Sequence, residues 1–264
     1  MSAAFVTGGS SGIGLEAARQ LASAGHDVAL FARDPDKLLA ARNSILNDAP
    51  SRRIEIFPVD VSERDTMLAA IDRALDIFGA PQMAIASAGI AEPGLFTEQS
   101  LALHEEHMAV NYFGSLYFTR AVSDAMITAG GGKIGLISSG AAFFGIYGYG
   151  AYAPSKFALR GLAEVLHLEL GHKGIGITLC YPPDTDTPQL AAENRTKPVA
   201  TQKITKGGGL WSAQDVAAAL IEGMNKDKFV VTPGFQIGAL HRLTSLIAPA
   251  LRWHQKRIIR KEEP

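Results

Sequence analysis

The chain has 264 residues, of which 47% are hydrophobic and 19% are charged, a balance typical of a folded globular protein. Its formal net charge is −1 at pH 7, so the composition gives no support to nucleic-acid binding through an overall positive field. The single cysteine, Cys180, excludes an internal disulfide and favours a reducing environment. Because Cys180 ends an apolar run, we expect a buried thiol rather than a nucleophile.

No part of the sequence predicts a membrane-spanning helix or a signal peptide. Its uninterrupted apolar runs are shorter than the ~18 residues of a candidate span. The first apolar segment begins at about residue 3, which leaves no room for a charged leader. We therefore expect a cytoplasmic protein without a spanning segment.

Apolar segments of strand length alternate with segments of helical periodicity along the chain. The expected strands are 3–7, 28–32, 54–60, 83–86, 134–138, 176–181 and 229–231. The expected helices are 15–24, 35–47, 63–78, 101–128, 152–171 and 212–225, the last with Ser212 as its N-cap. This alternation predicts an α/β fold in which a doubly wound parallel sheet of about seven strands has helices on both faces, forming three layers. Because no linker or composition break is visible, residues 1–264 are expected to form one domain.

A glycine-rich turn, TGGSSGIG at residues 7–14, separates the first strand from the first helix. Glycines allow backbone N–H groups to approach a pyrophosphate, and the helix N-terminus adds a favourable dipole. Such a turn alone is a weak signal, but its position after the first strand indicates a Rossmann-type dinucleotide site. The residues expected to form it are Gly8, Ser10, Ser11, Gly12, Ile13 and Gly14.

The end of the second strand indicates which dinucleotide binds. NAD sites usually place an acidic residue there to bind the ribose 2′-OH. This strand instead ends at Arg33, whose guanidinium suits a 2′-phosphate, and Lys37 follows one turn later. We therefore expect NADPH as the cofactor. The alternative is that Arg33 is a solvated charge paired with Asp34 or Asp36.

Two further strand ends carry residues suited to a cofactor. Asp60 and Val61 follow the third strand, where the Asp60 carboxylate could accept the adenine amino group or cap the next helix. Ser87, Ala88 and Gly89 follow the fourth strand, and such small residues allow the backbone to pass beside a ribose.

Four polar residues form a candidate catalytic set. Tyr152 and Lys156 are spaced i, i+4 and share a helix face, and Pro154 places Tyr152 near the helix N-terminus. The cation and the helix dipole should both lower the pKa of Tyr152 from about 10. Ser139 ends the fifth strand, and Asn111 lies within the long helix before it. Each has a structural alternative, namely a surface pair, a strand-end cap or a buried amide, but together they indicate acid–base catalysis.

Together these motifs resemble the short-chain dehydrogenase/reductase family over about residues 3–235. The resemblance rests on TGGSSGIG, Asp60-Val61, Ser87-Ala88-Gly89, Asn111, Ser138-Ser139 and Tyr152-x3-Lys156. One departure is Ser87, because the family usually has an asparagine there that steadies the central sheet.

The resemblance implies a role for each candidate. Tyr152 would deliver a proton to a carbonyl oxygen, and Lys156 would hold the nicotinamide ribose and lower the tyrosine pKa. Ser139, rather than Ser138, would orient and polarise the carbonyl, and Asn111 would hold a water of the proton relay. Hydride would come from NADPH, without a metal. The family also implies a homodimer or homotetramer.

The region after the sixth strand, about 182–211, is the substrate lid in this family. The usual opening of this lid is Pro-Gly-x-x-x-Thr, and here it reads PPDTDT. Thr187 therefore occupies the position where a hydroxyl would bond the nicotinamide carboxamide. Thr185 occupies the position of the backbone contact that precedes it. YPPDTDTP, ENRTKP and SKFALRGLAE resemble the 3-ketodihydrosphingosine reductases. These enzymes use NADPH to reduce a long-chain amino ketone to dihydrosphingosine in sphingolipid biosynthesis.

Several residues could recognise such a substrate. Asp184 and Asp186 are candidate anions for the amine, although one of them could simply cap a helix beginning at about Pro188. The residues that could line a pocket for the alkyl chain, or could equally be core or interface, are Phe143, Phe144, Ile146, Tyr147 and Tyr149.

The C-terminal tail, about 235–264, has amphipathic spacing, with basic residues around Trp253. It could rest on the inner face of a membrane, pack on a partner subunit or cover the pocket.

Two other functions stay open. One is NADPH-dependent reduction of another hydrophobic ketone, β-ketoacyl or steroid-like, and the other is a non-catalytic NADP-binding sensor. The intact set of Asn111, Ser139, Tyr152 and Lys156 argues against the sensor.

Overall fold

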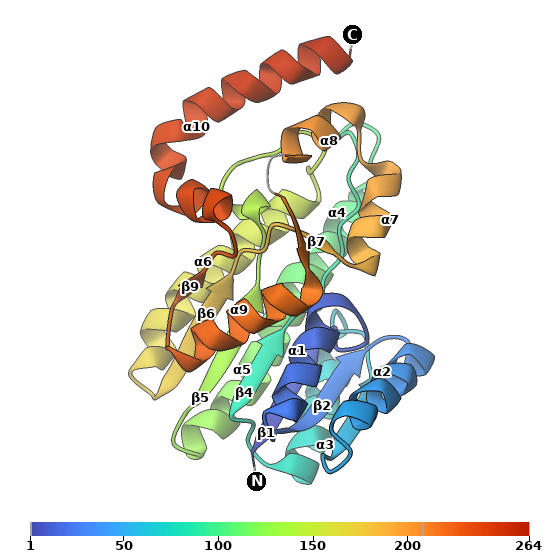
Figure 1. The fold of residues 1–264 in the computed structure, drawn as a ribbon, viewed down its shortest axis with the longest axis vertical. Coiled ribbons are helices and arrows are strands. Elements are labelled where there is room, and N and C mark those ends of the chain that lie inside the picture. Colours follow the sequence, from blue (N-terminus) through green and yellow to red (C-terminus); the bar gives the residue numbers. More distant parts are fainter. Residues whose placement is uncertain (1, 207–208, 264) are drawn as a thin grey trace.

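Seven parallel strands form the central sheet of the computed structural model, which describes residues 2–206 and 209–263. Their order is β3-β2-β1-β4-β5-β6-β9 (Figure 1). The strands are β1 Ala3–Thr7, β2 Asp27–Ala32, β3 Ile54–Pro58, β4 Met83–Ala86, β5 Gly132–Ile137, β6 Ile175–Cys180 and β9 Val230–Val231. The strand order reverses between β1 and β4, and ligands bind at such a point in doubly wound sheets. The predicted fold class is confirmed.

Helices cover both faces of the sheet because its strands are apolar on both sides. Side chains alternate along β1, where Ala3 and Phe5 enter one core and Ala4 and Val6 enter the other. The helices on the first face are α3 Arg64–Phe78, α5 Gly114–Thr128 and α6 Tyr152–Gly171. The helices on the second face are α1 Gly12–Ser23, α2 Pro35–Asp48 and α9 Ala213–Asn225.

Local chemistry explains several element ends. Pro58 has no N–H for a sheet ladder, and it is tolerated because β3 is an edge strand. The Ser212 hydroxyl accepts a hydrogen bond from Asp215 N at 3.0 Å, so the expected cap of α9 is confirmed. Cys180 is fully buried, as expected, and burial raises the pKa of its thiol to about 12.

The segment expected as one regular helix over 101–128 is instead interrupted. It comprises α4 Leu101–Met108, the π-helical turn η1 Ala109–Phe113 and α5. Asn111 lies in the middle of the π-helical turn. Single π-helical turns of this kind often occur at functional sites, and here the turn coincides with the hydrogen bonds of Asn111 described below.

The lid and the C-terminal tail lie beyond the carboxyl ends of the strands. The lid contains β7 Asp184–Asp186, α7 Pro188–Thr196, α8 Val199–Thr205 and β8 Leu210–Ser212, with β7 and β8 paired in parallel. Residues 207 and 208 of the expected lid lie outside the described residues. The tail forms α10 Phe235–Glu262, which passes above the lid (Figure 1). Among the helices that the structure describes, none is long and apolar enough to cross a membrane.

Candidate active site

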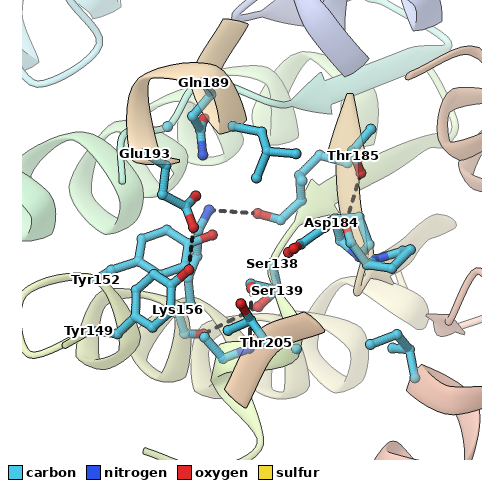
Figure 2. Close-up of a pocket in the computed structure, with 18 of the residues that line it drawn as sticks. Ser138, Ser139, Tyr149, Tyr152, Lys156, Asp184, Thr185, Gln189, Glu193 and Thr205 are labelled. Atoms are coloured by element: carbon cyan, nitrogen blue, oxygen red, sulfur yellow. Dashed lines mark hydrogen bonds between the residues drawn. The ribbon is translucent and has the colours of Figure 1, made fainter. Parts of the chain in front are cut away.

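A cavity of about 520 Å³ opens at the carboxyl ends of the strands, next to the point where their order reverses. Its walls come from the segments that follow β1, β4, β5 and β6, and from α7, α8 and α10. Ser139, Tyr152 and Lys156 line it together (Figure 2). The expected cofactor residues in its wall are Gly8, Ser11, Gly12, Ile13, Ala88, Gly89, Tyr152, Lys156, Thr185 and Thr187.

The glycine turn has the close approaches that a pyrophosphate cradle requires. Gly8 has φ +66°, and a Cβ there would lie 2.8 Å from Ala88 N. A Cβ at Gly14 would lie 2.4 Å from the Gly8 carbonyl oxygen, so only glycine fits. Helix α1 begins at Gly12, which brings its first N–H groups to the cavity wall. The turn therefore fits a dinucleotide phosphate.

Thr7 steadies the central strands, a role that sequence reasoning missed. Its hydroxyl oxygen accepts hydrogen bonds from Ser87 N at 3.1 Å and from Ala88 N at 3.2 Å. These bonds join the ends of β1 and β4, where the family usually uses an asparagine at the position of Ser87. A threonine directly before the glycines was the signal that could have suggested this contact.

Arg33 lies at the rim, outside the cavity wall. Its side chain is 60% exposed, and Nη1 lies 3.8 Å from Asp60 Oδ2. Asp34 does not pair with Arg33, because it caps α2 and forms an ion pair with Lys37 at 3.4 Å. Arg33 is thus held beside the strand end but remains accessible to a phosphate.

Asp60 and Val61 also lie outside the cavity wall. The second Asp60 oxygen accepts hydrogen bonds from the backbone N and the hydroxyl of Ser62 at 2.9 and 2.6 Å. Val61 is buried against α5, where a Cβ on Gly114 would lie 2.7 Å from its Cγ2. The local structural roles of both residues are therefore clear, and their cofactor contacts stay predictions.

Tyr152 is the first residue of α6, as expected, and it is buried beside Ser139. Burial raises the pKa of Tyr152, the charges of Glu193 and Asp184 raise it further, and a hydrogen bond with Ser139 lowers it. Ser139 also accepts a hydrogen bond from Ala141 N at 3.1 Å, so it caps the short 3₁₀ helix Gly140–Ala142 that follows β5.

The expectation that Lys156 lowers the pKa of Tyr152 is therefore wrong for this structure. Lys156 Nζ lies 5.6 Å from the centre of the Tyr152 ring and donates a hydrogen bond to Ile137 O at 3.0 Å. Burial and nearby carboxylates raise the phenol pKa, and Lys156 is not among the groups that lower it. The phenol consequently holds its proton at neutral pH, which is the state required of a proton donor.

Lys156→Met is expected to stabilise the folded protein below pH 8. Burial lowers the pKa of Lys156 from 10.5 to about 8, so the folded protein bears a penalty for the charged amine at every pH below about 8. From pH 8 to 10.5 the unfolded chain binds more protons, and the wild type gains stability as the pH rises. Urea unfolding across pH 6–10.5 should show the variant more stable by about 3 kcal/mol at low pH, with the gap closing above pH 8. The exposed Lys37→Met variant is the control, and a pH-independent gap would contradict this account.

Both the nitrogen and the oxygen of the Asn111 side-chain amide form hydrogen bonds. Nδ2 donates to Ile90 O at 3.0 Å and to Ser155 Oγ at 2.9 Å, while Oδ1 accepts from Ile90 N at 2.8 Å. A Cβ on Gly89 would lie 3.1 Å from Asn111 Oδ1 and 3.5 Å from Lys156 Nζ, so this glycine brings the backbone next to both side chains. The amide joins the segment after β4 to α6, and its part in a proton relay stays a prediction.

His107 is a second residue that sequence reasoning missed. It is fully buried, accepts a hydrogen bond from Glu92 N at 3.1 Å and donates one to Leu103 O at 2.8 Å. Its ring meets the Tyr152 ring edge-on, with centroids 6.5 Å apart. Burial lowers the pKa of His107, so we interpret it as a neutral support for the tyrosine.

Glu193 forms a buried link between the lid and the segment before α6. Its carboxylate accepts a hydrogen bond from the Tyr149 hydroxyl and pairs with Lys197 Nζ at 2.8 Å. The Tyr149 and Tyr152 rings lie 5.4 Å apart, so the link reaches the candidate proton donor. The ENRTKP segment gave a resemblance but no hint of this contact.

The PPDTDT segment shapes the beginning of the lid. Helix α7 begins at Pro188 as expected, but its cap is Thr187 rather than an aspartate, because Thr187 Oγ1 accepts a hydrogen bond from Leu190 N at 3.2 Å. Thr187 also donates to Thr185 O at 3.1 Å. Asp184 lies in the cavity wall, whereas Asp186 is exposed.

The far side of the cavity is apolar. Of the residues expected to line a pocket for the alkyl chain, Phe144, Ile146 and Tyr149 line the cavity. Phe143 instead packs in the core against Tyr181, with ring centroids 4.4 Å apart. Tyr147 lies outside the cavity wall, and its backbone N donates to Gln255 of α10 at 3.1 Å. The apolar residues that α10 contributes to the wall are Ile237, Ala239, Leu240, Ile247 and Leu251. One face of the tail therefore covers the pocket.

Comparison with known proteins identifies the family. The family model described as short chain dehydrogenase matches residues 2–198. The chain belongs to the short-chain dehydrogenase family. The glycine-rich turn, Ser139 and the Tyr152–Lys156 pair therefore occur in a member of the family that these motifs resembled.

Curated relatives extend over most of the chain. A 3-dehydrosphinganine reductase of Danio rerio is 38% identical over an alignment of 249 residues, and the alignment covers 92% of this chain and 74% of the relative. A 3-ketodihydrosphingosine reductase of Mus musculus is 37% identical with the same coverage. A 3-dehydrosphinganine reductase of Arabidopsis thaliana is 37% identical, covering 91% of this chain and 72% of the relative.

Solved structures of a reductase and of a short-chain dehydrogenase share the fold. Levodione reductase superposes with a TM-score of 0.82 at 23% identity, covering 90% of this chain and 98% of that one. A Sphingobium yanoikuyae short-chain dehydrogenase in complex with NADPH gives a TM-score of 0.80 at 24% identity, covering 96% and 95%. These similarities confirm the fold class.

Proposed function

We propose that the protein is an NADPH-dependent reductase that converts 3-ketodihydrosphingosine to dihydrosphingosine in sphingolipid biosynthesis. The observation that carries this proposal is a single cavity joining Ser139 and Tyr152 to the apolar face of α10. A ketone near Tyr152 could extend a long alkyl chain along Leu240 and Ile247. The names of the curated relatives, and the large share of this chain that their alignments cover, support the same substrate.

The catalytic roles in this proposal are those that the family resemblance implies, and the arrangement of the cavity supports them. Tyr152 donates its phenolic proton to the carbonyl oxygen, and its raised pKa keeps that proton in place until charge develops on the substrate. Ser139 orients the same oxygen by hydrogen bonding. NADPH, when bound, supplies the hydride. Lys156 lies close enough to Gly89 to hold a ribose there, and Asn111 supports the proton relay.

The cofactor assignment extends to residues around the cavity. The backbone of the glycine turn and the start of α1 would hold the pyrophosphate, with Ser10 and Ser11 as neighbouring donors. Arg33 and Lys37 would hold the 2′-phosphate. The remaining assignments are Asp60 and Val61 near the adenine, Ala88 and Gly89 beside a ribose, and Thr185 and Thr187 near the carboxamide.

Arg33→Asp should weaken NADPH binding by about 10- to 100-fold and change NADH binding little. The guanidinium is exposed and has one weak ion-pair partner, so its charge is available to a 2′-phosphate that only NADPH carries. Fluorescence titration with both nucleotides measures the effect, and Arg64→Asp, at another exposed arginine, is the control. Equal losses for both nucleotides would mean that Arg33 does not read the 2′-phosphate.

An oxidation assay tests the proposed reaction. The protein is mixed with NADPH and either 3-ketodihydrosphingosine or an acetoacetyl thioester, and NADPH consumption is followed. Turnover of the sphingoid ketone supports the proposal. Turnover of the thioester alone favours a reductase of another hydrophobic ketone, and binding of NADPH without turnover of any ketone favours a sensor.

We also propose one cytoplasmic domain over residues 1–264 that associates as a homodimer or homotetramer and touches a membrane through α10. The outer face of α10 supports the membrane contact, because Leu246 and Trp253 are exposed there beside basic side chains. The exposed basic residues of α10 are Arg242, Arg252, Lys256, Arg257, Arg260 and Lys261, of which Lys256, Arg257, Arg260 and Lys261 gather around Trp253.

A further inference from the structure

Two carboxylates line the cavity that contains Tyr152. Asp184 comes from β7 and Glu193 from α7, and they reach the pocket from opposite sides (Figure 2). The charges of both raise the pKa of Tyr152, so both lie within electrostatic reach of the proton donor. Their surroundings differ, and this difference suggests different functions.

Glu193 already has its partners within the protein. Lys197 Nζ lies 2.8 Å from its Oε1, the Tyr149 hydroxyl donates to the same oxygen, and the side chains of Lys197 and Glu193 are only 2% and 10% exposed. The negative charge is therefore balanced by a buried cation. Glu193 serves to fasten the lid, and a ligand is not needed to neutralise it.

Asp184 lacks such a partner. Within residues 2–206 and 209–263, no cationic side chain forms an ion pair with it, and its carboxylate accepts no hydrogen bond. Burial raises the pKa of Asp184 and Lys197 only partly opposes this effect. A half-buried carboxylate without a partner is unfavourable, and a cation in the cavity would relieve the cost.

We propose that Asp184 binds the protonated amine of the substrate and so selects amino ketones over uncharged ketones of equal length. This inference rests on the proposed function, in which the ketone lies at Ser139 and Tyr152. The amine of 3-ketodihydrosphingosine is on the carbon next to that ketone, so an anion in the same wall of the cavity is well placed to meet it.

The same contact assists proton transfer. The negative charge of Asp184 opposes loss of the Tyr152 proton, because it disfavours the phenolate. An ammonium group bound to Asp184 cancels this charge. Binding of the correct substrate therefore makes Tyr152 a better acid, whereas an uncharged ketone leaves the opposing charge in place.

Steady-state kinetics with two ketones test the proposal. The substrates are 3-ketodihydrosphingosine and the same molecule with hydrogen in place of the amino group, and the variants are Asp184→Asn and the exposed neighbour Asp186→Asn. Asp184→Asn should lower kcat/KM for the amino ketone by about 10- to 100-fold, chiefly through KM, and leave that for the deamino ketone equal or higher. Asp186→Asn should change neither value.

Other outcomes separate the failure of this inference from failure of the proposed function. Equal losses for both ketones, or no loss for the amino ketone, would overturn the role of Asp184 while the reductase activity stands. A wild type that reduces neither ketone overturns the proposed function. Equilibrium binding of dihydrosphingosine then decides the amine contact, since weaker binding by Asp184→Asn supports it and equal binding refutes it. Asp184→Ser replaces the asparagine variant if that variant folds poorly.

Discussion

Replacing Tyr152 with phenylalanine should lower the rate of ketone reduction by about a thousandfold while NADPH binding is retained. The change removes only the hydroxyl, and a positioned general acid typically contributes ~10²- to 10⁴-fold. The ring remains packed between Tyr149 and His107, so the cavity should keep its shape. Single-turnover oxidation of bound NADPH measures the chemical step, and nucleotide fluorescence measures binding.

Tyr147→Phe is the matched control for this substitution, because Tyr147 lies on the same segment but outside the cavity wall. It should leave the rate unchanged. A Tyr152→Phe enzyme with near-normal turnover would show that another group delivers the proton. Loss of NADPH binding together with activity would instead indicate that the tyrosine mainly maintains the cofactor site.

Lys197→Met should destabilise the protein by about 3–5 kcal/mol, the largest effect on stability that we expect. The substitution leaves the buried Glu193 carboxylate without its cation, whereas the Tyr149 hydrogen bond alone cannot balance the charge. The double variant Glu193→Gln/Lys197→Met removes both charges and should recover much of the loss. Urea unfolding gives the free energies.

An exposed pair with the same i, i+4 spacing provides the comparison. Lys226 and Glu222 are 58% and 62% exposed, so Lys226→Met should cost less than about 1 kcal/mol. If Lys197→Met costs no more than Lys226→Met, the buried pair does not hold the lid in place.

The sheet and most of its helices could be predicted because their signals are local. The bounds of β1, β4 and α6 match the expected ranges, since apolar runs, helical periodicity and glycine turns depend on neighbouring residues. Helix α8 was not expected, because its seven residues mix polar and apolar side chains without a clear helical periodicity. The π-helical turn was also missed, and it coincides with tertiary hydrogen bonds from Asn111 to Ile90 and Ser155 that no local pattern specifies.

The candidate site was predictable in its membership but not in its electrostatics. Tyr152 and Lys156 are four residues apart at a helix N-terminus, so the sequence predicted that the cation and the helix dipole would both lower the phenol pKa. The structure adds burial and the carboxylates of Asp184 and Glu193, which come from the lid. The Tyr149–Glu193 contact joins residues 44 positions apart, and no local pattern specifies such a pairing.

Helix α10 supplies the apolar wall of the pocket, whereas other elements supply its catalytic groups, and this separation has an evolutionary consequence. The groups assigned to chemistry come from the segment after β5, from η1 and from α6, whereas the apolar wall at Ile247 and Leu251 comes from a helix that follows all of them in the sequence. Gln255 fastens that helix through hydrogen bonds to Gly145 O at 3.0 Å and Tyr147 N at 3.1 Å. Substitutions at helical spacing before Gln255 can therefore lengthen or shorten the space for an alkyl chain without disturbing the proton donor. Preference for chain length and the capacity to reduce a ketone are thus free to diverge separately within this architecture.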